Sequence, residues 1–159
     1  KIGATDLGYR IAKQFNLNVT NLFPALVPLT FKNDTLEFCK NLAGISINAS
    51  VAIDKISFEE GLVFTHRGVS GPSILQISSY WKKGKSISIN LLPSDNFYEI
   101  LTNKRLNSAK TNISNILSEY LPKNLAIAIC CLALSILACL RHAHAFNIPA
   151  HFIIKCKLI

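Results

Sequence analysis

The stretch Gly61-Leu-Val-Phe-Thr-His-Arg-Gly-Val-Ser-Gly-Pro-Ser-Ile-Leu-Gln-Ile-Ser-Ser-Tyr80 decides how this chain folds. Its unbroken apolar run from Leu62 to Phe64 predicts a strand. We expect the strand to break at the next glycine and the chain to continue as a helix, with Ser70 or Gly71 as the N-cap. The proline that follows suits the first helical position, and the apolar residues beyond it recur at helical spacing. The predicted geometry is a strand, a sharp turn and a helix N-terminus.

An uncovered helix N-terminus attracts anions because its backbone N–H groups have no partner within the helix. The residues around this turn are therefore the candidate substrate contacts, namely Thr65, His66, Arg67, Ser70 and Gly71. The alternative interpretation is a capped junction at which the same side chains only satisfy the local backbone. For His66 the choice lies between a group that titrates or donates beside a ligand and a histidine bonded to the strand end. Both interpretations are open, and no residue is assigned as catalytic.

Three segments of the chain resemble segments of a bacterial flavoprotein family. Residues 65–72 are similar to the signature Thr-His-x-Gly-x-Ser-Gly-Pro of NAD(P)/FAD-dependent oxidoreductases, some of which are aminoacetone-oxidase-like enzymes. Residues 24–29 read Pro-Ala-Leu-Val-Pro-Leu and are similar to a strand of that family. Residues 3–12 resemble the family's Gly-Ala-Thr-Gly-Asp-Gly-Tyr-x-x-Ala segment, with Asp6-Leu7 in place of its Gly-Asp. The resemblance covers residues 1–124.

The resemblance implies that the chain is the substrate-side domain inserted into an FAD-binding domain. Residues 1–19 would form the edge of the FAD-binding domain, with Gly3, Thr5, Asp6 and Gly8 near the flavin. The expected chemistry is transfer of hydride from NAD(P)H to flavin and then to an acceptor, or oxidation of a small amine or alcohol. The expected partners are the remainder of the FAD-binding domain and a small-molecule substrate that the sequence does not identify.

The chain itself contains no Gly-x-Gly-x-x-Gly after a strand, which is the element that cradles a dinucleotide. We therefore expect this chain alone to bind no FAD and to be inactive. For the glycine-containing loop before residue 7, the alternative is a plain loop that precedes an amphipathic helix.

The hydrophobic pattern predicts an α+β fold, in which a small twisted or barrel-like sheet with packing helices is followed by a helical subdomain. The β-rich inserted domain would occupy residues 20–93 and the helical subdomain residues 94–124. Helix caps are expected at Asp6, at Asp34 or Thr35, at Ser94 or Asp95, and at Thr111. Besides the helix after Gly71, the expected helices cover residues 7–15, 35–42, 96–106 and 113–120. The expected strands, besides the one at Leu62–Phe64, cover residues 22–31, 45–53, 56–60 and 87–91.

Residues 125–159 differ in character from the rest of the chain. Leu125 to Leu140 is a run of sixteen residues without a charge, which predicts a helix that is apolar on all sides. The run is shorter than the roughly 20 residues that span a bilayer. We expect a divergent, truncated or out-of-frame end that packs poorly or covers the two preceding helices in a non-native way. The alternative function is a non-catalytic remnant domain that binds a partner or a membrane through this apolar tail.

The formal net charge of +8 would suit an anionic partner, but the basic residues are dispersed. The one tight group is Lys82, Lys83 and Lys85, which we interpret as a solvated hairpin edge. No basic helix with interleaved aromatic residues appears, so no nucleic-acid partner is expected. Because the chain begins at Lys1 and contains no methionine, we expect a fragment or a processed product.

Cysteine and histidine are concentrated after residue 125, at Cys130, Cys131, Cys139, His142, His144, His151 and Cys156. No repeated Cys-x-x-Cys pair occurs, and thiols within an apolar helix are commonly buried. We therefore expect no metal site, no nucleophilic cysteine and no disulfide framework. No signal-peptide pattern is visible near residue 1, so a cytoplasmic location is expected.

Overall fold

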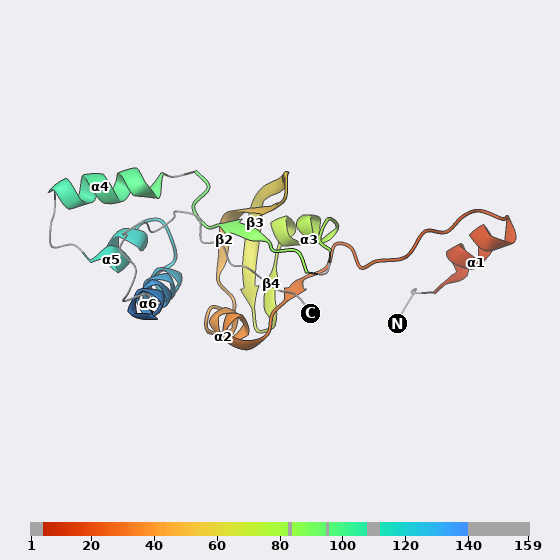
Figure 1. Ribbon diagram of the computed structural model, residues 1–159, viewed down its shortest axis with the longest axis horizontal. Helices are drawn as coiled ribbons and strands as arrows, with labels where there is room; N and C mark the ends of the chain where they lie inside the picture. Colours follow the sequence, from red (N-terminus) through yellow and green to blue (C-terminus); the bar gives the residue numbers. More distant parts are fainter. Residues whose placement is uncertain (1–4, 83, 95, 108–111, 140–159) are drawn as a thin grey trace.

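The computed structural model describes residues 5–82, 84–94, 96–107 and 112–139, and their fold is of the predicted α+β class. A curled antiparallel sheet resembling half a barrel carries the core, and helices pack around it (Figure 1). The order of the strands is β1-β4-β3-β2-β5, and every neighbouring pair is antiparallel. The strands are β1 (Leu29–Thr30), β2 (Ser46–Ile53), β3 (Ile56–Thr65), β4 (Gly68–Ser70) and β5 (Ser88–Asn90).

The central hairpin of β2 and β3 forms as the alternating pattern predicts. The register runs from Ser46 opposite Val63 to Ile53 opposite Ile56, around the two-residue turn Asp54-Lys55. Every second residue of β2 from Ala49 onward is buried, because one face of the sheet covers the core while the other is accessible to solvent. Leu62 and Phe64 of β3 lie on the same buried face.

Six helices complete the described part of the chain. In Figure 1, α2 and α3 lie against the sheet, α4, α5 and α6 gather on its β5 side, and α1 stands apart on an extended segment. The buried cluster of the sheet also contains Leu117, Leu121 and Leu125, so the C-terminal helices pack onto the same core. The helices are α1 (Leu7–Gln14), α2 (Asn33–Asn41), α3 (Pro72–Ser78), α4 (Phe97–Asn107), α5 (Ile113–Leu117) and α6 (Lys123–Cys139).

The strand expected over residues 22–31 is wrong except at its end, where the two residues of β1 pair with β4. Pro24 and Pro28 have no N–H to give to a ladder, and Leu26 has a positive φ of 53°. A hydrogen bond to the side chain of Ser78 fixes the segment instead. The Val27 N–H donates to Ser78 Oγ at 3.0 Å, and that hydroxyl donates to the Leu75 carbonyl at 2.7 Å.

The expected helix caps are confirmed only at Asp6, and there only in position. Asp6 is the N-cap residue of α1, but its side chain accepts no capping hydrogen bond, and its carboxylate lies 3.3 Å from the Arg10 guanidinium instead. Helix α2 begins at Asn33, which places Asp34 and Thr35 inside its first turn. Asn112 caps α5 by accepting from the Ser114 N–H, whereas Thr111 lies outside the described residues, as does Asp95.

The apolar tail packs where the structure describes it. Helix α6 begins at Lys123, and its Ala126 N–H donates to the Pro122 carbonyl. Leu125 and Ala126 are fully buried, and α6 lies against α5. The expectation of poor packing is therefore wrong for the start of the tail, whereas the alternative, a non-native covering of the preceding helices, stays a prediction. Residues 140–159 lie outside the described part.

Candidate functional site

The signature segment folds as a hairpin that the sequence pattern did not predict. Thr65 ends β3, His66 and Arg67 form the turn, and Gly68 begins β4 opposite Thr65. The Thr65 hydroxyl accepts from the Arg67 N–H at 3.3 Å and donates to the Gly68 carbonyl at 3.2 Å. Both bonds join the Thr65 side chain to the local backbone, as in the alternative interpretation given above for this residue. The expected direct step from strand to helix is therefore wrong, because a three-residue strand lies between them.

The five candidate residues divide between the two ends of this short strand. Helix α3 starts after its N-cap residue Gly71, which has a positive φ of 105°, and proline occupies the first helical position as predicted. The Ser73 hydroxyl donates to the Gly61 carbonyl at 3.1 Å, so the start of α3 lies against the middle of β3. Gly61 and Thr65 are four strand residues apart, which corresponds to about 13 Å. The sequence led us to expect the start of α3 beside the residues of this turn. The structure places it away from them.

The side chains of two residues are exposed at the turn. His66 and Arg67 both lie at the surface, and no ion pair joins either of them to another described residue. The Arg67 carbonyl accepts from the Phe31 N–H at 3.0 Å, which fixes the turn against β1. The backbone of the turn is thus anchored while its side chains remain available to an anionic ligand.

The glycines of the signature permit close backbone contacts. A Cβ atom at Gly68 would lie 2.1 Å from the Leu29 carbonyl oxygen, and one at Gly71 would lie 2.5 Å from the Gly61 carbonyl oxygen. Both distances are far below van der Waals contact, and both residues have positive φ. These two glycines therefore have a structural role, because they let β4 and α3 approach β1 and β3.

The residues expected near the flavin do not form a dinucleotide site among themselves. Thr5, Asp6 and Gly8 are exposed at the start of α1, and Gly3 lies outside the described residues. A Cβ at Gly8 would meet nothing within 4 Å, so this glycine is not part of a tight cradle. The described strands are all antiparallel, whereas a dinucleotide cradle follows a strand of a parallel βαβ unit. The described residues therefore do not fit the pyrophosphate of FAD.

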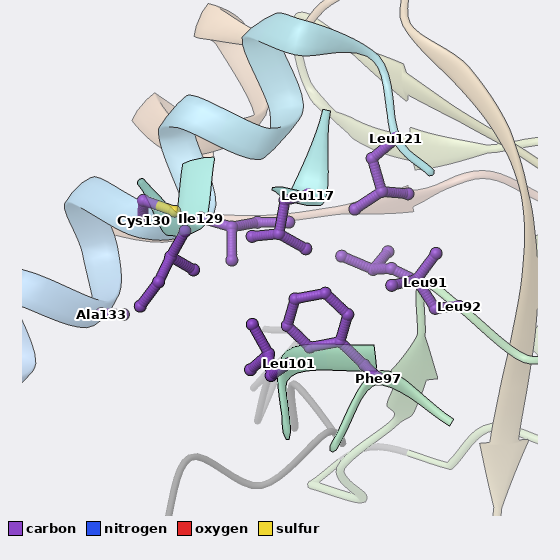
Figure 2. A pocket seen from close by; sticks show the side chains of 10 residues that line it. Leu91, Leu92, Phe97, Leu101, Leu117, Leu121, Ile129, Cys130 and Ala133 are labelled. Atoms are coloured by element: carbon purple, nitrogen blue, oxygen red, sulfur yellow. The ribbon is translucent and has the colours of Figure 1, made fainter. Parts of the chain in front are cut away.

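A small apolar cavity of about 90 Å³ lies between the end of β5 and the three C-terminal helices. Figure 2 shows side chains after β5 and from α4, α5 and α6 turned toward this space. Its lining side chains are apolar apart from the thiol of Cys130, whose pKa is raised by burial and, to a lesser extent, by the neighbouring Cys131. The sequence analysis did not single out this cavity, because its walls come from four separate segments. The lining residues are Leu91, Leu92, Phe97, Leu101, Ile113, Leu117, Leu121, Ile129, Cys130 and Ala133.

The thiol of Cys39 is poorly suited to act as a nucleophile. Burial raises the pKa of Cys39 to about 12, so this thiol stays protonated at neutral pH. Among the residues that the structure describes, no group of three His, Cys, Asp or Glu could hold a metal ion. His142, His144, His151 and Cys156 lie outside those residues. Within the same described ranges, no helix has both the length and the apolar character to cross a bilayer.

The family follows from comparison with known proteins. Residues 23–143 match the model of the HI0933-like protein barrel and H2TH domain. The chain belongs to the HI0933-like family. This family consists of FAD-dependent oxidoreductase-like proteins, which agrees with the flavoprotein resemblance of the sequence. The HI0933-like match begins after α1 and continues past residue 124, where the resemblance seen in the sequence ends.

Two curated relatives carry the same name. The chain is 42% identical over 125 residues to the ribosomal RNA dihydrouridine synthase of Escherichia coli (strain K12). It is also 42% identical over 125 residues to the ribosomal RNA dihydrouridine synthase of Haemophilus influenzae (strain ATCC 51907 / DSM 11121 / KW20 / Rd). Each alignment covers 78% of this chain and 31% of the relative. The chain thus spans less than a third of the length of these relatives.

Proposed function

We propose that this chain is the barrel and H2TH part of a longer, flavin-dependent ribosomal RNA dihydrouridine synthase. The observation that carries the proposal is the 42% identity over 125 residues to two proteins of that name. The antiparallel half-barrel with its C-terminal helices agrees with the domain description of the family. The proposed role of the chain is to present RNA to a redox centre that the rest of the protein provides.

The proposed reaction agrees with the expectation that this chain is inactive alone. Dihydrouridine is uridine with a reduced C5–C6 double bond, so its synthesis adds a hydride and a proton to the base. Flavins supply hydride chemistry, while the protein supplies binding and orientation. Since the described residues do not fit a dinucleotide, we assign FAD, and NAD(P)H as its reductant, to the remainder of the protein. A uridine within RNA then replaces the small-molecule substrate that the sequence led us to expect.

The exposed hairpin turn is the proposed RNA-facing element of the signature. His66 and Arg67 project from an anchored backbone without an ion-pair partner in the described residues. A guanidinium binds phosphate through paired N–H groups, which suits the backbone of a nucleic acid. The expectation that no nucleic acid binds this chain remains a prediction, and the present proposal departs from it.

The activity is tested with the full-length protein that contains this chain, in vitro transcribed ribosomal RNA and NAD(P)H. We expect dihydrouridine in the digested RNA, detected by mass spectrometry as a nucleoside heavier than uridine by two hydrogens. Arg67→Ala should raise KM for RNA about tenfold, while Lys40→Ala on α2 should leave it unchanged. If flavin-loaded protein reduces no uridine in any ribosomal RNA, the proposed function is wrong.

We also propose that α1 packs against the remainder of the longer protein. Its apolar stripe is bare, since Leu7, Ile11 and Phe15 are 52%, 45% and 71% exposed, and no residue of α1 is buried. A helix of eight residues is marginal in water without a surface to pack on. More than two thirds of each relative lies outside the alignment, which is ample chain to supply that surface.

If α1 packs in this way, replacing two equally exposed isoleucines by alanine should lower the free energy of unfolding by different amounts. Ile11 and Ile113 are both 45% exposed and both lie in helices. In the full-length protein, Ile11→Ala should lower the free energy of unfolding by about 2–4 kcal/mol, because this side chain becomes buried in the interface. Ile113→Ala should cost less than about 1 kcal/mol. Chemical denaturation measures both, and equal losses would contradict the proposed packing of α1.

A further inference from the structure

The fold brings an aromatic pair and several lysines together at the end of the β2–β3 hairpin. This end projects beside α3 in Figure 1. The loop after α3 reaches it, because the Lys85 ammonium contacts the Asp54 carboxylate of the hairpin turn. The rings of Phe58 and Tyr80 lie 5.9 Å apart at an interplanar angle of 34°. Lys55 and Phe58 are far from Tyr80 in the sequence, which is why the sequence showed only a solvated lysine group.

Tyr80 is an exposed ring with a fixed support. Its side chain is 49% exposed, while Phe58 is half-buried and packs against the core. The tyrosine therefore contacts its support on one side and solvent elsewhere. The next residue also fixes the loop, since the Trp81 Nε1–H donates to the Lys85 carbonyl at 2.9 Å. A pre-positioned aromatic ring at a surface is the element on which unpaired bases stack.

The lysines of the hairpin turn and of the loop after α3 are available for phosphate. Lys55 and Lys82 are exposed, and neither forms an ion pair with any residue in the described ranges. Asp54 is occupied by Lys85, so the pair contributes little net charge. Glu59 and Glu60 on β3 are the other acidic residues of this hairpin, and they follow Phe58 away from the turn. The unpaired lysines of this end of the hairpin are thus Lys55 in the turn and Lys82, two residues after Tyr80.

We propose that this surface, formed by Lys55, Phe58, Tyr80 and Lys82, binds an unpaired segment of ribosomal RNA. A base stacks on Tyr80, and the flanking phosphates contact Lys55 and Lys82. Single-stranded RNA is recognised by this combination of an aromatic platform with cationic side chains. The inference rests on the proposed function, because an RNA substrate gives the surface its partner. It adds a second contact, separate from the turn at His66 and Arg67.

The test measures binding of a short, fluorescein-labelled single-stranded RNA to the full-length protein by fluorescence anisotropy. Tyr80→Leu keeps an apolar side chain over Phe58 but removes the stacking ring, and it should weaken binding about tenfold. Tyr80→Phe keeps the ring and should bind as the unsubstituted protein does. Lys55→Ala and Lys82→Ala should each reduce the slope of log K against log salt by about 0.7.

Lys104→Ala is the matched control for charge. Lys104 lies on α4, where its ammonium is bonded to both carboxylate oxygens of Glu119 at 2.7 Å. This variant changes the net charge by the same amount as the other lysine variants and should leave the salt slope unchanged. The inference is overturned if Tyr80→Leu binds normally, if Lys104→Ala matches the hairpin variants, or if the unsubstituted protein binds no RNA.

The two proposals fail in different ways. If the unsubstituted protein forms dihydrouridine and the hairpin variants bind and react normally, the RNA surface is wrong and the proposed function stands. If the RNA binds through Tyr80 but no uridine is reduced by flavin-loaded protein, the surface stands and the activity is wrong. An unchanged urea-unfolding midpoint for each variant shows that any loss of binding is not a loss of fold.

Discussion

Gly71→Ala is expected to lower the free energy of unfolding by about 3–5 kcal/mol. The added Cβ would lie 2.5 Å from the Gly61 carbonyl oxygen and 3.0 Å from the Leu62 Cα. Both atoms belong to the backbone of β3, the longest strand of the sheet, which cannot move without disturbing its pairing with β2. The residue also has a φ of 105°, which an alanine rarely adopts.

Gly44→Ala separates the clash from the backbone strain. Gly44 has a φ of 91°, but a Cβ there would meet nothing within 4 Å. Its substitution should therefore cost only the strain, about 1–2 kcal/mol. Urea denaturation of both variants measures the difference. If the two losses are equal, the close approach of α3 to β3 is not what requires glycine at position 71.

Phe64→Ala is expected to cost about 3–5 kcal/mol, because it leaves a cavity at the centre of the core. Phe64 is 1% exposed and meets the ring of Phe38 edge to face, with the ring centroids 6.3 Å apart. Calorimetry should show a fall in Tm that accompanies the loss. Tyr98→Ala removes a ring of similar size that is 70% exposed on α4, and it should change stability by less than about 0.5 kcal/mol. A comparable fall in both variants would mean that Phe64 is not a core residue.

The sequence predicted the elements whose signal is local and repeated. The alternation of buried and accessible residues along β2 is visible in the sequence, because each inward side chain is buried independently of the others. The two-residue turn at Asp54-Lys55 comes directly after this strand. Strand β4 was missed because three residues with a glycine at the start carry no such repeat. Residues 68–70 form a strand because they pair with both β1 and β3. This pairing depends on the tertiary fold and not on the local sequence.

The candidate site was predicted in composition but not in geometry. The resemblance identified residues 65–72, and the structure shows that two of its glycines serve close packing. The separation of the helix start from His66 and Arg67 depends on the register of β3 against β4, which the sequence does not reveal. The surface at Tyr80 was missed for a related reason, since Lys55 and Phe58 reach it only through the hairpin.

The strands at both margins of the sheet are very short, which limits how readily they can pair with strands of other molecules in concentrated solution. β1 and β5 contain two and three residues, so each offers few unpaired N–H and C=O groups to a neighbouring molecule. The part of β3 that β4 does not cover meets α3, whose Ser73 hydroxyl occupies the Gly61 carbonyl. Edge-to-edge growth into intermolecular sheets, the route by which open β-structures aggregate, therefore has little template in these two strands.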